Sequence, residues 1–425
     1  MLLSLPPELI ELIVDEVSRS SDGRPSLKSL SRVAKAWTHP CQQHLWAKAI
    51  FFTSQGTAGH SKTRLLARRI MSHPHIGTHV RTLKYWAQTP DTGKRRNQRE
   101  DLERVAGALT CMTNLVDVTL GYGWGNITLA FDECPASWQE AIARVIIAPS
   151  LQHLELHNIS RIPFELLERA LGNLVGVALL GCQFKRQESQ GTALGRNFER
   201  SITALGGITC DSRSYRSLQR CLYPRSEVQP CGPELSSVGR LELTIDTPLD
   251  DCHLLRNLTK LTNLHLCFIK SSAPDSEHPP FGAVLLQVHP SVYTSLTRLT
   301  VTAHQGISMS STTDPLLGLC SEEILPKFSS LQTLHLELHF EFDNLIGHVP
   351  NASVELWFQS PSWGRLDAIL SRPASFAKLQ EVCIEIYLRR IASSISERIS
   401  SLLRRSSFTG LQRRDSEEEG FSFEL

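Results

Sequence analysis

A short pattern of apolar residues recurs along most of the chain. In each copy, one apolar residue is followed by two others, three and five positions later. Polar residues alternate with these apolar ones, which is the two-residue period of a strand with one buried face. The copies follow one another at intervals of about 33 residues on average. Their first residues are Val80, Leu115, Leu151, Leu174, Leu205, Val238, Leu261, Leu296, Leu331 and Leu379. Each copy therefore predicts a short strand.

Segments with helical periodicity precede most of these strands, for example residues 102–112, 164–172, 251–261 and 363–370. One helix and one short strand per repeat resembles a leucine-rich repeat, in a degenerate form. The full repeat signature adds Asn or Cys and a further apolar residue, which only the copy ending in Cys182 and Phe184 provides. We expect an α/β fold in which residues 79–390 form an irregular, horseshoe-like leucine-rich-repeat solenoid of parallel strands plus helices. Another α/β arrangement of stacked strand–helix units stays open.

The first fifty residues predict three short helices with a surplus of apolar side chains. One helix begins at the prolines after Leu5, the second follows residues 20–23, and Pro40 is expected to begin the third. So small a bundle cannot bury all these side chains, so the excess predicts either a partner interface or packing on the first repeat. The apolar positions are Leu9, Ile10, Ile13, Val14 and Val17, then Leu27, Leu30, Val33 and Trp37, then Leu45, Trp46 and Ile50.

Residues 4–50 resemble an F-box. The resemblance rests on Leu5-Pro-Pro-Glu-Leu9, on Leu30 and Val33-Ala-Lys-Ala-Trp37, and on Leu45-Trp46. Ala34 stands where the family often has Cys. The next stretch, with Leu65-Leu66, Pro74-His75-Ile76 and Leu83, is similar to F-box-like proteins of higher fungi, in which a helix and a Pro-His turn lead into the first repeat strand.

The resemblance implies a non-catalytic substrate-recognition subunit of a Skp–cullin–F-box ubiquitin ligase. Its F-box would dock the Skp-type adaptor, and through it a cullin, while the repeats hold a target protein. An interaction scaffold that recruits no ligase is the alternative. The residues expected to form or support the adaptor-facing surface are Leu5, Pro6, Leu9, Ile10, Ile13, Leu30, Val33 and Trp37.

The polar positions of the predicted strands share one face of the sheet, which we expect to bind the target. Same-face neighbours on one strand lie about 7 Å apart, too far to surround a zinc ion without side chains from adjacent strands, so we expect no metal and no cofactor. The mixed charges favour a polar protein partner. The target-binding candidates on this face and in adjoining loops are Lys84, Trp86, Trp124, His153, Glu155, Arg240, Glu242, His265, Arg298, His335 and Glu337.

Five of the seven tryptophans lie in or beside irregular segments that follow the strands: Trp86, Trp124, Trp138, Trp357 and Trp363. They are either exposed binding anchors or side chains that fold back over the edge of the array. The glycine-rich run from Gly121 to Gly125 is expected to be a flexible loop.

Composition narrows the function classes. The 425 residues carry 44 Lys and Arg against 43 Asp and Glu, a net charge of +1, which disfavours nucleic acid as a partner. No apolar run is long enough to span a bilayer, and the N-terminus lacks the basic region of a secretory signal, so we expect no membrane association and a cytoplasmic or nuclear protein. The 11 cysteines form no C-x-x-C pair, and no catalytic motif is found; an enzyme using a Cys–His pair is the remaining alternative.

The expected organisation is therefore a small docking module followed by one long array. The boundaries are an F-box over 1–52, a linker helix over 53–78, the repeats over 79–390, a capping helix over 391–414 and an acidic disordered tail over 415–425.

Overall fold

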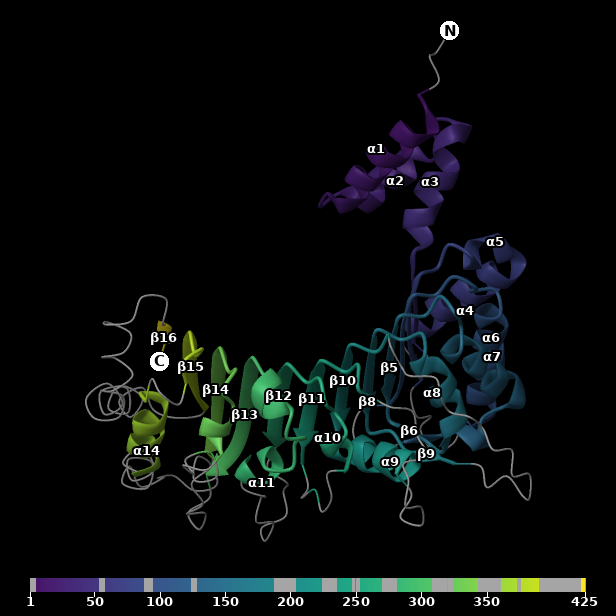
Figure 1. The fold of residues 1–425 in the computed structure, drawn as a ribbon. Coiled ribbons are helices and arrows are strands. Elements are labelled where there is room, and N and C mark those ends of the chain that lie inside the picture. Colours follow the sequence, from purple (N-terminus) through teal and green to yellow (C-terminus); the bar gives the residue numbers. More distant parts are fainter. Residues whose placement is uncertain are drawn as a thin grey trace. The chain divides into compact units, whose positions relative to one another are not determined.

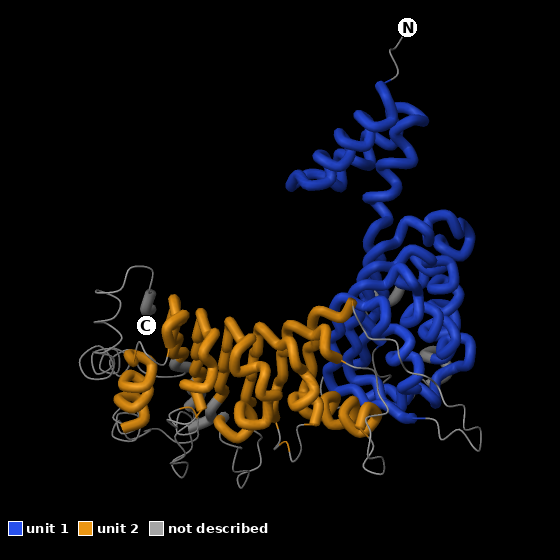
Figure 2. Tube along the Cα trace, in the orientation of Figure 1, with its two compact units in different colours: residues 1–196 blue, residues 197–425 orange. Residues whose placement is uncertain are grey.

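The computed structural model places most of the chain in two compact units, residues 1–196 and 197–425 (Figures 1 and 2). The residues that the structure describes are 5–52, 58–87, 95–123, 128–186, 204–223, 235–246, 249, 253–269, 281–307, 319, 324–342, 361–372, 376–389 and 422–424. Each unit is a parallel sheet with helices, so the predicted α/β class is confirmed.

Three helices open the first unit: α1 (Pro7–Arg19), α2 (Gly23–Leu30) and α3 (Lys35–Trp46). They meet around a small core of Ile10, Val14, Leu27 and Cys41. Gly23 is required where α2 starts, because a Cβ there would lie 2.5 Å from the carbonyl oxygen of Val17. The three predicted helices are present, and their packing depends on this close approach.

The third helix differs from its prediction. It begins at Lys35, with Pro40 inside it, and Ile50 belongs to a strand. A proline within a helix removes a hydrogen bond and costs about 3 kcal/mol. The burial of Cys41, with Trp37 and Leu45 packed beside it, offsets that cost, since tertiary packing overrides local propensity.

Five parallel strands form the main sheet of the first unit, in the order β1 (Lys48–Phe52), β2 (Thr82–Ala87), β3 (Asp117–Tyr122), β5 (His153–His157) and β8 (Gly176–Leu180). The register aligns equivalent positions of successive copies, so that Leu83, Val118, Leu154 and Val177 form one buried row. Strand β1 was not predicted.

The remaining helices of the first unit lie along one face of this sheet (Figure 1), with α4 against α6, α6 against α7 and α7 against α8. They are α4 (Ala58–Ser72), α5 (Pro74–Gly77), α6 (Arg95–Leu109), α7 (Ala136–Ile146) and α8 (Phe164–Leu171), with the 3-10 turn η1 (Phe131–Glu133). Two short parallel pairs join β4 (Leu129–Ala130) to β6 (Ile159–Ser160) and β7 (Ile162–Pro163) to β9 (Phe184–Lys185).

The second unit repeats the arrangement with seven parallel strands in chain order. They are β10 (Gly207–Asp211), β11 (Arg240–Ile245), β12 (Asn263–Ile269), β13 (Arg298–Ile307), β14 (Thr333–Phe342), β15 (Glu381–Arg389) and β16 (Ser422–Glu424). Its helices are α9 (Ser212–Leu222), α10 (His253–Arg256), α11 (Phe281–Leu285), α12 (Val292–Ser295) and α14 (Pro361–Leu370), with the 3-10 turn η2 (Leu325–Lys327).

All ten predicted copies contain a strand, and the three apolar positions of every copy are buried. The helices are shorter than expected in places: α10 has 4 residues where the pattern predicted a helix over 251–261. The expected capping helix over 391–414 lies outside the described residues. Residues 422–424, assigned to a disordered tail, instead form β16 beside β15, since an unpaired strand edge offers hydrogen bonds to any adjacent extended segment.

Candidate functional site

An exposed apolar row lies along α1, beside the face that packs into the helical core. Ile10, Val14 and Val17 face the core, whereas Leu9, Leu12 and Ile13 remain 45%, 63% and 40% exposed. Leu5, just before the helix, is exposed too. Leu9, Leu12 and Ile13 share one side of α1, because residues three and four apart are neighbours on a helix, and Leu5 lies just before the first turn. We call Leu5, Leu9, Leu12 and Ile13 the α1 apolar surface.

The predicted adaptor-facing residues fall into two groups. Leu5, Pro6, Leu9, Ile13 and Val33 are exposed, and Val33, at 71%, lies in the turn between α2 and α3. Ile10 is buried in the core, and Leu30 and Trp37 pack against that core, so these three support the surface from within.

Sequence reasoning missed Leu12, one of the most exposed apolar residues of these helices. Its spacing of three from Leu9 and seven from Leu5 was the available signal.

The polar face of the first unit carries a hydrogen-bonded group on β3 and β5. The register places Lys84, Thr119 and Glu155 in one row. Thr119 Oγ1 donates to Glu155 Oε2 over 2.9 Å, and His157 Nε2 lies 2.7 Å from Glu155 Oε1. The hydrogen bond with His157 lowers the pKa of Glu155, with smaller help from Thr119 and Lys84, although burial opposes the shift. His153 is exposed at the start of the same strand.

Trp86 lies across the next row of this face. Its ring centroid is 4.9 Å from that of His157, with Gly121 on the strand between them. A Cβ at Gly121 would lie 2.2 Å from Cε3 of Trp86, so the glycine makes room for the indole. Gly121 and Tyr122 belong to β3, which corrects the expected flexible loop at these two positions.

Two of the other tryptophans decide between the alternatives of exposed binding anchors and side chains packed into the protein. Trp138 in α7 and Trp363 in α14 are each 1% exposed, so both are core residues and not binding anchors. Trp86 is half-buried. Trp124 and Trp357 lie outside the described residues.

In the second unit, charged and imidazole side chains of neighbouring strands lie within reach of one another. Arg240 Nη2 lies 3.7 Å from Glu242 Oε2, and His265 Nδ1 lies 3.7 Å from Glu242 Oε1. His265 Nε2 is 3.0 Å from Thr302 Oγ1, which donates to Glu337 Oε2 over 3.1 Å. Arg298 is exposed at the start of β13. The expected shared polar face is thus observed within each unit.

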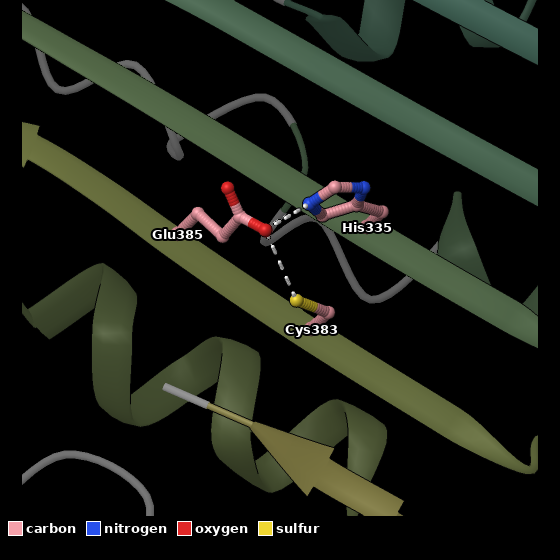
Figure 3. A group of neighbouring side chains, drawn as sticks. All are labelled: His335, Cys383 and Glu385. Atoms are coloured by element: carbon pink, nitrogen blue, oxygen red, sulfur yellow. Dashed lines mark hydrogen bonds and ion pairs between the residues drawn. The ribbon is translucent and has the colours of Figure 1, made fainter. Parts of the chain in front are cut away.

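The densest group on this face lies where β14 meets β15 (Figure 3). His335 pairs in register with Cys383, and Glu337 with Glu385. His335 Nε2 lies 3.3 Å from Glu385 Oε1, and Cys383 Sγ lies 3.8 Å from the same oxygen. The pairing of two adjacent strands therefore brings these side chains close together, which side chains of a single strand could not achieve.

Three aromatic rings stack in the row beyond this group. His304, His339 and Tyr387 occupy matching positions of β13, β14 and β15. Their successive centroids are both 4.4 Å apart, with interplanar angles of 15° and 6°. Tyr387 also donates its hydroxyl hydrogen to Glu385 Oε2, and this hydrogen bond lowers the pKa of Glu385.

Three buried or half-buried cysteines are poorly suited to nucleophilic chemistry at neutral pH. Burial raises the pKa of the Cys134 thiol to about 12 and that of Cys267 to about 11, and raises that of Cys210 still further. The thiolate is the reactive form, so such groups are mostly inert.

No family model matches this chain, and no curated protein is significantly similar to it in sequence. Within the part of the chain that the structure describes, no helix has the length and apolar character needed to cross a bilayer.

Proposed function

We propose that this protein is a substrate-recognition subunit of a Skp–cullin–F-box ubiquitin ligase. The observation that carries the proposal is the α1 apolar surface, which occurs within the stretch of sequence that resembles an F-box. Five of the eight positions that the resemblance assigns to the adaptor-facing surface are exposed, namely Leu5, Pro6, Leu9, Ile13 and Val33.

The energetics favour a partner on this surface. Fully burying a Leu or Ile side chain contributes about 1.5–3 kcal/mol, and the side chains of the α1 apolar surface retain about half of their exposure. Covering Leu9, Leu12 and Ile13 would therefore contribute a few kcal/mol to association. The core beneath is small, so a bound adaptor would also stabilise the helices themselves.

The polar faces of the sheets provide the second binding surface in this proposal. Glu155 lies beside His157 on β5, Glu337 lies beside His335 on β14, and Glu242 of β11 pairs in register with His265 of β12. A face with both charge signs and many donors and acceptors suits a polar protein surface better than a polyanion. The protein would act by proximity, holding a target beside a ubiquitin-transferring complex and supplying no catalytic group.

Co-purification of the full chain with a Skp-type adaptor tests the proposal. The variant Leu9→Glu with Leu12→Glu places charges on exposed positions and should abolish adaptor recovery while the protein stays folded. Leu65→Glu is the matched control, because Leu65 in α4 is 63% exposed, as Leu12 is, but lies outside the three helices.

Recovery of the adaptor with the wild type and with Leu65→Glu, and its loss from the double variant, is the expected result. A wild-type chain that recovers no adaptor overturns the proposal and leaves the interaction scaffold.

A further inference from the structure

We propose that β14 and β15 hold a zinc-type transition-metal ion between His335, Cys383 and Glu385. The donor atoms of these three half-buried side chains all lie within 4.8 Å of one another (Figure 3). They combine an imidazole, a thiol and a carboxylate, which are the three common protein ligands of Zn²⁺.

The distances suit a tetrahedral ion. Zinc–ligand bonds of about 2.0–2.3 Å place neighbouring N and O ligands about 3.3 Å apart, and S and O ligands about 3.5 Å apart. The observed separations from Glu385 Oε1 are 3.3 Å to His335 Nε2 and 3.8 Å to Cys383 Sγ. The third separation, between the donor atoms of His335 and Cys383, is within 4.8 Å and would be about 3.5 Å around a bound ion.

The Nε2 atom of His335 supplies an independent indication. It is shielded from solvent, and its neighbouring acceptor is Glu385 Oε1, 3.3 Å away, which is long for a hydrogen bond. Buried polar atoms in proteins nearly always have a well-placed partner, and a bound ion is one recognised explanation for a buried atom that lacks one. A metal bound to this nitrogen would satisfy it.

Neighbouring groups orient the proposed ligands. Tyr387 donates to Glu385 Oε2, which leaves Oε1 directed at His335 and Cys383. Glu337 Oε1 lies 3.7 Å from the second ring nitrogen of His335, and Thr302 donates to the other oxygen of Glu337. A carboxylate beside the distal nitrogen of a ligating histidine is a recurrent feature of zinc sites.

The ligand set also selects the metal. Thiolate and imidazole favour Zn²⁺ over Mg²⁺ and Ca²⁺, which prefer oxygen ligands. Three protein ligands leave one coordination position, which a water molecule would occupy on the exposed side of the sheet. This inference does not depend on the proposed function, because metal binding by these three side chains requires neither an adaptor nor a target protein.

Metal titration of the full chain, after treatment with a chelator, tests the proposal. Co²⁺ serves as the spectroscopic probe, since a thiolate ligand gives a charge-transfer band in the near ultraviolet, and Zn²⁺ should then displace it. The expected result is one equivalent of bound metal with that band for the wild type, and no response to Mg²⁺. Cys383→Ser and His335→Gln should each lose the band and the bound equivalent.

Cys267→Ser is the matched control, because Cys267, like Cys383, is a half-buried cysteine on the polar face, but it lies on β12, three strands from β15. It should bind like the wild type. Circular dichroism checks that each variant is folded. Tyr387→Phe, which removes only an orienting hydroxyl, should weaken metal binding by about 10-fold. The proposal is overturned if the wild type binds no equivalent, or if Cys383→Ser and Cys267→Ser retain it equally.

Discussion

The Nε2 atom of His44 in α3 lies 2.8 Å from the Oδ1 atom of Asp15 in α1. Both side chains are partly exposed, and the pair joins the second half of α1 to the last turn of α3. The orientation of α1, and of the apolar surface on it, therefore depends on this polar contact as well as on the core.

Replacing Asp15 with Asn should cost little stability. Partly exposed ion pairs contribute about 0–1 kcal/mol, because solvent screens them. We expect the free energy of urea unfolding to fall by less than about 1 kcal/mol. A loss above about 2 kcal/mol would show that the contact is a principal support of the helices.

Alanine substitutions should separate the core of the helices from their surface. Ile10→Ala removes a side chain that is 5% exposed, and such changes cost about 2–5 kcal/mol. Leu12→Ala, at a 63% exposed position, should stay within about 0.5 kcal/mol. Hydrogen exchange of the α1–α3 amides in the full chain measures both. Equal effects would contradict the assigned burial.

The row formed by Glu155 and His157 should contribute to the acid stability of the first unit. The pKa of Glu155 is lowered in the folded chain, so the folded state favours the ionised carboxylate. The resulting stabilisation is present above the ordinary pKa of a glutamate and is lost as the pH falls through the lowered value.

Glu155→Gln should therefore lower the melting temperature at neutral pH and make it less sensitive to acid. Glu140→Gln is the control, since its ion pair with Arg144 lies in solvent. Identical pH profiles for the wild type and Glu155→Gln would rule out this contribution.

Gly121 is expected to tolerate no side chain while Trp86 keeps its place. Gly121→Ala forces a Cβ to within 2.2 Å of the Trp86 ring, and overpacking of this kind costs about 1–3 kcal/mol. Gly207→Ala in β10 is the control, because its Cβ would approach no heavy atom closer than 3.7 Å. Adding Trp86→Ala to Gly121→Ala should remove the clash. Urea unfolding of these variants measures each effect.

The repeated strands could be predicted because their signal is local. Apolar residues such as Leu334 and Leu336 alternate with polar ones, which specifies one buried face. Because each copy carries this pattern at the same positions, the pattern also sets the register between strands. The strand β1 carries no such copy. It forms by pairing with β2, which is a tertiary interaction, and its residue Ile50 had been assigned to the preceding helix by the periodicity of the sequence.

The group at β14 and β15 was missed for a related reason. His335 meets Cys383 and Glu385 only through the pairing of strands that are 48 residues apart in sequence. The signal was available, since His335 and Cys383 occupy the same position of successive copies. Trp138 and Trp363 were harder to assign, because proximity to an irregular segment does not reveal which side of a helix is buried.

The most direct test of the account is the equilibrium affinity of the purified full-length chain for a purified Skp-type adaptor. The account predicts specific binding by the wild type and by Leu65→Glu, and at least about 100-fold weaker binding by Leu9→Glu with Leu12→Glu, as loss of two or more buried apolar contacts implies. Absence of binding by the wild type, or equal affinity for all three proteins, would contradict it.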